Sequence, residues 1–386
     1  MWRALASNMI TFLAVILFLM AGVVLWGKAQ YTAEGPLDEA ICLRVERGSS
    51  MTRVSRDLEE AGAVKSAAIF RIGADYTKKS SRLKAGSFLV QPGTSMAGIV
   101  DQVTRGGAST CGTEVVYRIG VTRTLAQVRE LDPTTNEFVK KAEFILAQDE
   151  APKEYTRVRA DRDTRYRVAM AEGVTSWQVV ETLRVLEMLE GDVAEIPAEG
   201  MLAPDSYDIA PGAQRADILA QMQEKQILLI AAAWEGRADG LPLQSPEELL
   251  ILASIIEKET GVPEEREQVA SVFVNRLNKG MRLQTDPTVI YGITEGKRVL
   301  GRGLKRSELR KITRWNTYII EGLPVTPIAN PGVASLEAAA HPEATDYVFF
   351  VADGTGGHAF AGTLEEHNRN VAAWRKIEAE RANSDN

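Results

Sequence analysis

The first 30 residues follow an almost uninterrupted apolar pattern. No charged residue lies between Arg3 and Lys28, and Thr11 is the single polar residue from Met9 to Trp26. Eighteen residues at about 1.5 Å each reach about 27 Å as a helix, close to the hydrocarbon thickness of a bilayer. No small-x-small cleavage site follows this run. We therefore predict a cytoplasmic stub and an uncleaved transmembrane helix within residues 1–30, with a buried helix of a soluble protein as the alternative.

The orientation of this helix would decide the compartment of the remaining chain. The charge bias is weak, because Arg3 and Lys28 flank the apolar run on opposite sides. A lone N-terminal anchor ahead of a large polar region usually exports that region, and the sequence contains no second span. We expect a single-pass protein of a bacterial inner membrane, with its large part on the periplasmic or outer face. Such an oxidising compartment permits a disulfide between Cys42 and Cys111, with two unrelated buried thiols as the alternative.

Three later segments share the pattern G-x-[ST]-x3-[VI]-x3-[LV], beginning at Gly48, Gly93 and Gly173. The glycine suits a turn, the hydroxyl residue suits a helix N-cap, and the apolar residues four apart lie on one helix face. Alternating segments at 41–45 and 166–168 precede the first and third copies. The pattern predicts strand–turn–helix units, although any capped amphipathic helix would produce it.

The first unit extends into a small predicted module over residues 37–110. Its first helix would end near Gly62, a second would cover 65–76, and 86–90 would form a return strand. This layout resembles a LysM-like module, a βααβ fold found in cell-wall proteins, which implies either glycan binding or a purely architectural role. Residues 111–165 form a variable connection, in which 151–165 is charged, lacks an apolar period and is predicted to be a linker or exposed extension.

The larger C-terminal region, residues 166–382, predicts a mixed α/β domain that opens with a small strand–turn–helix unit at 166–190. A nearly all-apolar helix follows Pro246, a second helix runs from Pro263 to Gly280, and 281–291 is predicted to be extended with a turn at Asp286-Pro287. A capping box at Thr363 opens a last helix that ends near residue 379. The predicted fold class is α+β.

Composition narrows the functional classes. The chain has 386 residues, of which 45% are apolar and 25% charged, as in ordinary globular proteins of two or three domains. A net charge of −7 argues against nucleic-acid binding. Two cysteines and three histidines, without a metal-binding pair, predict neither a metal site nor a cofactor.

One acid in this region is a candidate for chemistry. Glu257 ends the mostly apolar helix, where burial and the negative end of the helix dipole would both raise its pKa. A carboxyl that stays protonated near neutral pH suits a general acid. Glu259 lies about 200° further round the helix, so the two acids cannot share one face. Because Glu257 lies beside Leu250 and Ala253, we expect it to have the more apolar surroundings, with an exposed acid at a frayed helix end as the alternative.

Several ordered blocks match a known family. Residues 252–260, 269–277 and 281–292 read LASIIEKET, VASVFVNRL and MRLQTDPTVIYG, and further blocks lie at 199–207, 328–332 and 338–342. Together they resemble the endolytic murein transglycosylases (YceG-like) over about residues 166–372. Ser206-Tyr207 and a long 111–165 stretch depart from the family pattern.

The resemblance implies a reaction and a catalytic residue. Family members cleave the β-1,4 bond between N-acetylmuramic acid and N-acetylglucosamine inside peptidoglycan strands and leave 1,6-anhydro-muramic ends, which limits strand length. The family's catalytic glutamate corresponds to Glu257, which would protonate the leaving oxygen and then accept the proton of the attacking C6 hydroxyl. This mechanism needs no second carboxylate. A two-carboxylate glycosidase would need one, and Asp286 or Glu199 could serve.

Other residues of the matched blocks carry amides, carboxylates or aromatic rings that suit a glycan cleft, although each could have an ordinary structural role. These are Asn275, Gln284, Thr285, Asp286, Tyr291, Asn316, Tyr318 and His358. The predicted partners are peptidoglycan strands, the membrane and, by family analogy, peptidoglycan synthases. Two other functions stay open: a non-catalytic peptidoglycan-binding scaffold, and a hydrolytic muramidase that would leave reducing ends.

Overall fold

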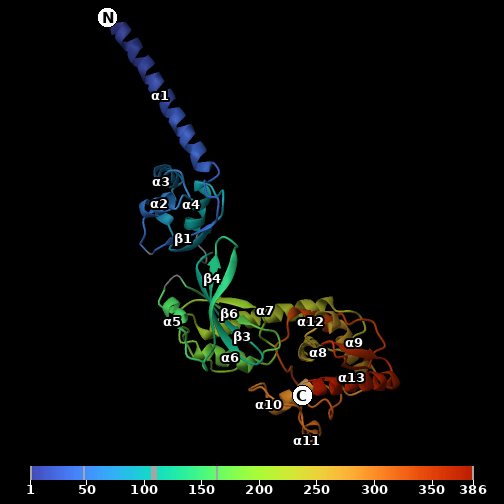
Figure 1. Ribbon diagram of the computed structural model, residues 1–386. Coiled ribbons are helices and arrows are strands. Elements are labelled where there is room, and N and C mark those ends of the chain that lie inside the picture. The colour runs from blue at the N-terminus through green and yellow to red at the C-terminus, as the bar shows by residue number, and fades with distance from the viewer. Residues whose placement is uncertain (1, 47, 106–110, 162–163, 385–386) are drawn as a thin grey trace. The chain divides into compact units, whose positions relative to one another are not determined.

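The computed structural model describes residues 2–46, 48–105, 111–161 and 164–384 and is a mixed α+β structure (Figure 1). The chain forms two compact units. The N-terminal unit comprises Met1–Val115, Gln127–Glu143 and Ala151–Arg165, and the C-terminal unit comprises Val116–Ala126, Phe144–Glu150 and Tyr166–Asn386.

Helix α1 (Trp2–Thr32) contains the apolar run predicted to be an anchor. Within the described residues it is the one helix that is long and apolar enough to cross a membrane, over the 22 residues Thr11–Thr32. None of this segment is buried in the structure, and Phe18 is 81% exposed. Length and composition therefore agree with a single-pass helix.

The N-terminal unit contains the predicted order of strand, helix, helix and strand. These are β1 (Ile41–Val45), α2 (Met51–Glu60), α3 (Ala67–Tyr76) and β2 (Gly86–Val90), with a 3-10 turn at Ser80–Arg82 and α4 (Met96–Arg105) after the second strand. Strands β1 and β2 are antiparallel, with Ile41 opposite Val90. The hydroxyls of Ser50 and Ser66 cap α2 and α3. The predicted end of the module at residue 110 lies outside the described residues.

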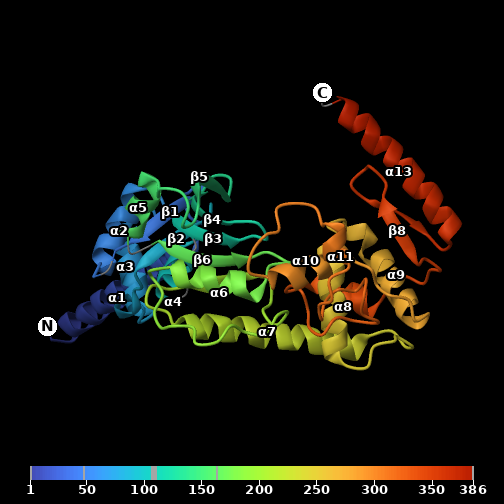
Figure 2. The same cartoon turned by 90° about the horizontal axis from the view of Figure 1, so that it is seen from below.

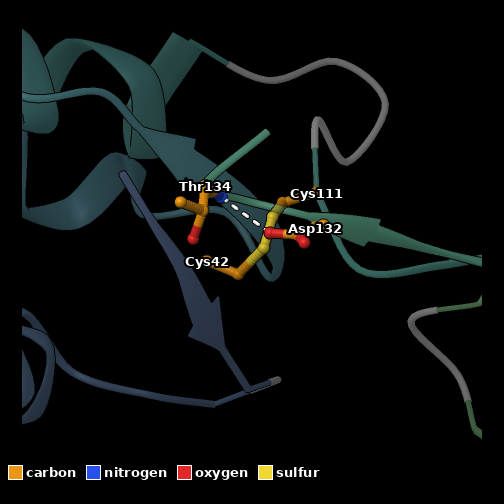
Figure 3. Close-up of a disulfide and its surroundings, with 4 residues drawn as sticks. All are labelled: Cys42, Cys111, Asp132 and Thr134. Atoms are coloured by element: carbon orange, nitrogen blue, oxygen red, sulfur yellow. Dashed lines mark hydrogen bonds between the residues drawn. A yellow bond between two sulfur atoms is a disulfide. The ribbon is translucent and has the colours of Figure 1, made fainter. Parts of the chain in front are cut away.

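A disulfide joins Cys42 of β1 to Cys111, whose Cα atoms lie 5.7 Å apart, within the ordinary range for such bonds. Figure 3 shows the bond beside a turn in which the Asp132 carboxylate accepts a hydrogen bond from the Thr134 amide at 2.9 Å. Of the two alternatives left open by the sequence, the bonded pair is therefore the one found.

Residues 111–165 contain more regular structure than the sequence indicated. They form β3 (Thr113–Ile119), β4 (Thr124–Asp132), β5 (Glu137–Ile145) and α5 (Lys153–Arg159). The linker expected over 151–165 is thus partly helical, since Tyr155 and Val158, three residues apart, are buried. A helix of two turns needs only two such residues and is too short to show an apolar period.

The strands belong to one five-stranded sheet of order β5-β4-β3-β6-β7. Strand β6 (Arg165–Met170) is antiparallel to β7 (Ser206–Ile209), with Val168 opposite Tyr207. The turn after β6 leads to α6 (Ser176–Val185), where Thr175 and Gln178 form a capping box. This is the third predicted strand–turn–helix unit.

The rest of the C-terminal unit packs around α8 (Pro246–Glu259), whose residues Leu249–Ile256 are all buried. Helix α7 (Arg215–Gly236) runs from the end of α6 to α8, as Figure 2 shows. Helices α9 (Arg266–Asn278), after a 3-10 turn at Pro263–Glu265, and α12 (Val333–Ala340) also pack on α8. The remaining elements are α11 (Arg306–Leu309), the hairpin β8 (Phe349–Ala352) with β9 (His358–Ala361), and α13 (Leu364–Ser384).

One predicted element was wrong. Residues expected to be extended beyond a turn at Asp286-Pro287 form helix α10 (Asp286–Thr294). Proline has no N–H to lose in the first turn of a helix and already has a helical φ, so Pro287 begins this helix instead of marking a turn. Thr288 and Val289 of its first turn are buried.

Candidate active site

The candidate site lies where α8 leaves the hydrophobic core. After Ile256 the helix continues for one charged turn, Glu257-Lys258-Glu259, and ends at Thr260. All three side chains are half-buried. Because successive positions are about 100° apart, each of the three meets different neighbours.

Glu257 is held by the beginning of α12. Its Oε2 accepts hydrogen bonds from the Gly332 amide at 3.1 Å and from the Ser335 hydroxyl at 2.7 Å. Both donors come from the beginning of α12 and fix the orientation of the Glu257 carboxyl group. Within the described residues, no protein group donates to Oε1. One oxygen therefore fixes the carboxylate and the other stays available to a ligand.

A second carboxylate, that of Glu172, lies near Glu257. It comes from the turn after β6, and a Cβ on Gly332 would clash with its Oε1, so both carboxylates meet at Gly332. Burial, followed by the negative charge of Glu257, raises the pKa of Glu172, while Arg266, 4.0 Å away, lowers it. Glu172 was not among the residues predicted from the sequence. Its position directly before Gly173 of the third strand–turn–helix unit was the one sequence feature that could have indicated it.

Lys258 links the site to a buried network. Its Nζ donates to the Gly173 carbonyl at 3.2 Å. Burial lowers the pKa of Lys258, whereas the charges of Glu257 and Glu199 raise it. The amine is thus within electrostatic reach of both carboxylates.

Glu199 lies inside this network, and neither of its oxygens is available. Its Oε1 accepts from the Ser176 amide at 2.8 Å and from the Asn330 side chain at 3.3 Å, and its Oε2 accepts from the Tyr291 hydroxyl at 3.1 Å. Burial raises the pKa of Glu199, and burial and then Glu199 raise that of Tyr291. These contacts suit a structural acid better than the partner carboxylate of a glycosidase.

Glu259 lies on a different face of α8 from Glu257, as helix geometry predicts. The Thr285 hydroxyl donates to its Oε1 at 2.6 Å. Burial raises the pKa of Glu259, and the Asp286 charge raises it further. The sequence predicted the more apolar surroundings for Glu257. The structure differs from this expectation, because burial raises the pKa of Glu259. The helix is buried nearly all round, so its own pattern could not show which acid the neighbouring segments would cover.

Four of the predicted cleft residues gather near Glu259. The Tyr318 hydroxyl donates to Asp286 Oδ1 at 2.7 Å, and Thr285 contacts Glu259 directly. His358 lies within electrostatic reach of Glu259, and its Nδ1 is 2.8 Å from Glu265 Oε2. Burial and then Asp286 raise the pKa of Tyr318. A glycan-binding role for this group stays a prediction.

Two other predicted residues, Asn275 and Asn316, hold loops in place, and a third, Gln284, is exposed. The Asn275 amide donates to the carbonyls of Thr345 and Tyr347 at 2.8 and 2.9 Å. The buried Asn316 amide donates to several carbonyls around α11, including that of Lys311 at 2.7 Å. Gln284 is exposed, with a φ of +46°. These contacts correspond to the ordinary structural roles that the sequence left open.

A cavity of about 280 Å³ adjoins the site. Gly173, Lys258 and Tyr291 are among the residues that line it. A Cβ on Gly173 would lie 3.6 Å from Glu257 Cγ, so the cavity wall is also the neighbour of the candidate acid. Within the described ranges, no group of three or more His, Cys, Asp or Glu side chains could hold a metal ion.

Two neighbouring carboxylates thus lie beside a cavity, at the end of a buried helix. This arrangement suits acid–base chemistry on a polar substrate. The chain belongs to the YceG-like family, whose model matches residues 43–373. The resemblance inferred from the sequence blocks is therefore confirmed.

Relatives of known name align over almost the whole chain. The endolytic murein transglycosylase of Bacillus subtilis is 29% identical over 357 residues, which cover 91% of this chain and 89% of that protein. The protein of the same name from Streptococcus pneumoniae is 27% identical over 383 residues, or 94% of this chain, which spans only 64% of that longer protein. A crystal structure of a yceG-like protein from Listeria monocytogenes is 26% identical, covers 86% of this chain and 99% of its own, and has a TM-score of 0.46.

Proposed function

We propose that this chain is an endolytic murein transglycosylase, a lyase that cleaves the bond between N-acetylmuramic acid and N-acetylglucosamine inside peptidoglycan strands and so limits their length. The family match over residues 43–373 carries this proposal, together with relatives of that name that align with more than nine-tenths of the chain. The carboxylates at the end of α8 support it, because the reaction needs a carboxyl group that first donates a proton and then accepts one.

In the proposed mechanism Glu257 acts first as acid and then as base. It protonates the leaving glycosidic oxygen as the C1–O bond breaks, and the sugar's own C6 hydroxyl bonds to C1. The hydroxyl proton passes to Glu257, which restores the acid, and no water is consumed. Oε1 would make both transfers, because the Gly332 amide and the Ser335 hydroxyl hold Oε2.

The nearby Glu172 supports a proton-holding site. Burial raises the pKa of Glu172, and the negative charge of Glu257 raises it further, because two carboxylates in proximity resist carrying two negative charges. A raised pKa favours the protonated form of a carboxyl group, and a protonated carboxyl group can donate a proton. Glu172 is also the residue to test if the products carry reducing ends, because a hydrolytic glycosidase needs a second carboxylate.

The proposed location of the enzyme is supported by α1 and the disulfide. We propose that α1 is a single-pass anchor and that the rest of the chain lies on the outer face of the inner membrane. The bonded Cys42–Cys111 pair supports this side, since disulfides persist in oxidising compartments. Residues 37–110 would form the LysM-like module and 166–382 the catalytic domain. At this place the enzyme would work beside peptidoglycan synthases.

Glutamate variants test the proposal. We expect Glu257→Gln to lower the cleavage rate of uncrosslinked peptidoglycan by about 10²–10⁴-fold, the usual contribution of acid–base catalysis. The substitution should not unfold the chain. Glu259→Gln is the matched control on the same helical turn and should reduce the rate by less than about tenfold. Both rates are measured on the full chain in detergent, with circular dichroism as the check on folding. Wild-type turnover by Glu257→Gln, or equal losses in both variants, would contradict the assignment.

A further inference from the structure

The segment 297–314, here called the basic loop, has a charge opposite to that of the whole protein. It contains eight Lys and Arg residues and one acid, in a chain of net charge −7. All eight basic side chains are exposed. Lys297 pairs with Glu295 at 2.7 Å, and Arg302 pairs with Glu308 at 2.6 Å. Within the described residues, the other six form no ion pair with a carboxylate. A cluster of unpaired cations repels itself and favours an anionic ligand.

The basic loop borders the cavity beside the candidate acid. Arg298, Gly301 and Arg302 line this cavity together with Lys258 and Tyr291. The Arg302 guanidinium is already held by both oxygens of Glu308, whereas Arg298 has no partner within the described residues. Arg298 is therefore the available guanidinium at the cavity, and its planar donors suit a carboxylate.

The position of Arg298 favours the substrate over the membrane as the source of the anion. A bilayer presents a broad surface of headgroups, whereas a cavity of about 280 Å³ admits a chain or a small group. The muramic acid at the cleaved bond carries a short peptide, and a few extended residues reach roughly 10 Å. The carboxylates of that peptide can therefore reach a cavity wall next to the residue that cleaves the bond.

We propose that the cavity binds the acidic peptide branch of the glycan, with Arg298 as its carboxylate-binding residue, so that the enzyme prefers strands that carry peptides over bare strands. This inference rests on the proposed function and specifies the substrate of the same site. Tyr291 would supply an apolar surface, and the remaining basic side chains would attract the branch from solution.

The test compares two uncrosslinked substrates of equal length, one with peptides and one stripped of them, using the full chain in detergent. We expect the wild type to cleave the peptide-bearing strands at least about tenfold faster in kcat/KM. Arg298→Gln should bring the ratio of the two rates close to one, chiefly through KM. Arg310→Gln removes the same charge from the basic loop outside the cavity and should lower the ratio by less than about threefold.

Equal cleavage of both substrates by the wild type would overturn the inference while leaving the proposed function intact. Equal losses in Arg298→Gln and Arg310→Gln would also overturn it, because the effect would then be a diffuse charge effect. A loss of cleavage that occurs only in anionic vesicles, and that is the same with and without peptides, would also overturn it, because it would indicate membrane binding. If the wild type cleaves neither strand, the proposed function fails. Calorimetric binding of a disaccharide-peptide then decides the inference, with about tenfold weaker binding by Arg298→Gln expected and equal binding contradicting it.

Discussion

Asn330 connects the segments that frame the candidate site. Its side chain is fully buried, accepts from the Leu202 amide at 2.8 Å and donates to the Val174 carbonyl at 2.9 Å and to Glu199 at 3.3 Å. Its own carbonyl accepts from the Gly173 amide at 2.9 Å. The residue thus fixes the turn after β6, the segment before β7 and the approach to α12.

Replacing Asn330 by Ala should destabilise the C-terminal unit by about 2–4 kcal/mol. The Leu202 amide would lose its acceptor, and a buried donor without a partner costs about 1–3 kcal/mol. The Val174 carbonyl keeps a second donor, the Asn330 backbone amide at 2.9 Å, and adds little. The space left by the side chain supplies the rest, because the surroundings of a fully buried residue relax only in part.

Urea unfolding of the full chain in detergent, followed by tryptophan fluorescence, measures this loss. Four of the six tryptophans lie in the C-terminal unit, at positions 177, 234, 315 and 374. With an m-value of about 2 kcal/mol/M, the midpoint should fall by about 1–2 M. Asn278→Ala, at the exposed end of α9, is the control and should change stability by less than about 0.5 kcal/mol. A loss of the same small size in Asn330→Ala would refute the bridging role.

Three further predictions test other parts of the structure. The Cys42–Cys111 bond spans 69 positions, so chain entropy predicts that replacing both cysteines by Ala destabilises the N-terminal unit by about 4 kcal/mol. A melting curve that neither reductant nor the substitution changes would contradict this. Because burial raises the folded-state pKa of Glu259 above its unfolded value, stability should fall as the pH rises from the unfolded towards the folded pKa. Glu259→Gln should therefore be more stable than the wild type at pH 7 and lose this advantage near pH 4 in urea unfolding, and the opposite trend would argue against a buried acid. Gly332 has an ordinary backbone φ of −79°, but the Cβ added in Gly332→Ala would displace the Glu172 carboxylate. We therefore expect a stability change under about 1 kcal/mol and about a tenfold loss of cleavage rate. Full activity would show that the carboxylate pair is dispensable.

Local patterns predicted the elements better than the contacts between them. The caps at Ser50 and Thr175 and the buried length of α8 follow from neighbouring residues, and the structure contains all three. The Asp286-Pro287 dipeptide was ambiguous, because the same two residues can close a turn or open a helix.

The site itself depends on contacts between residues far apart in the sequence. Glu172 and Glu257 are separated by 85 positions, and both reach Gly332, a further 75 positions along the chain. The burial of Glu259 arises from α10 and its neighbours, which a helical pattern over α8 does not contain. Glu257 could therefore be selected from the sequence as the candidate acid, whereas the neighbouring Glu172 could not.

The most direct test of the proposed function is the chemical identity of the product ends. The full chain is incubated with uncrosslinked peptidoglycan, and the fragments are analysed by mass spectrometry, with Glu257→Gln as the control. The proposed mechanism predicts internal fragments that end in 1,6-anhydro-muramic acid and that are absent with the variant. Reducing ends would contradict it, because they would require water as the nucleophile and a second carboxylate, with Glu172 as the residue to replace next.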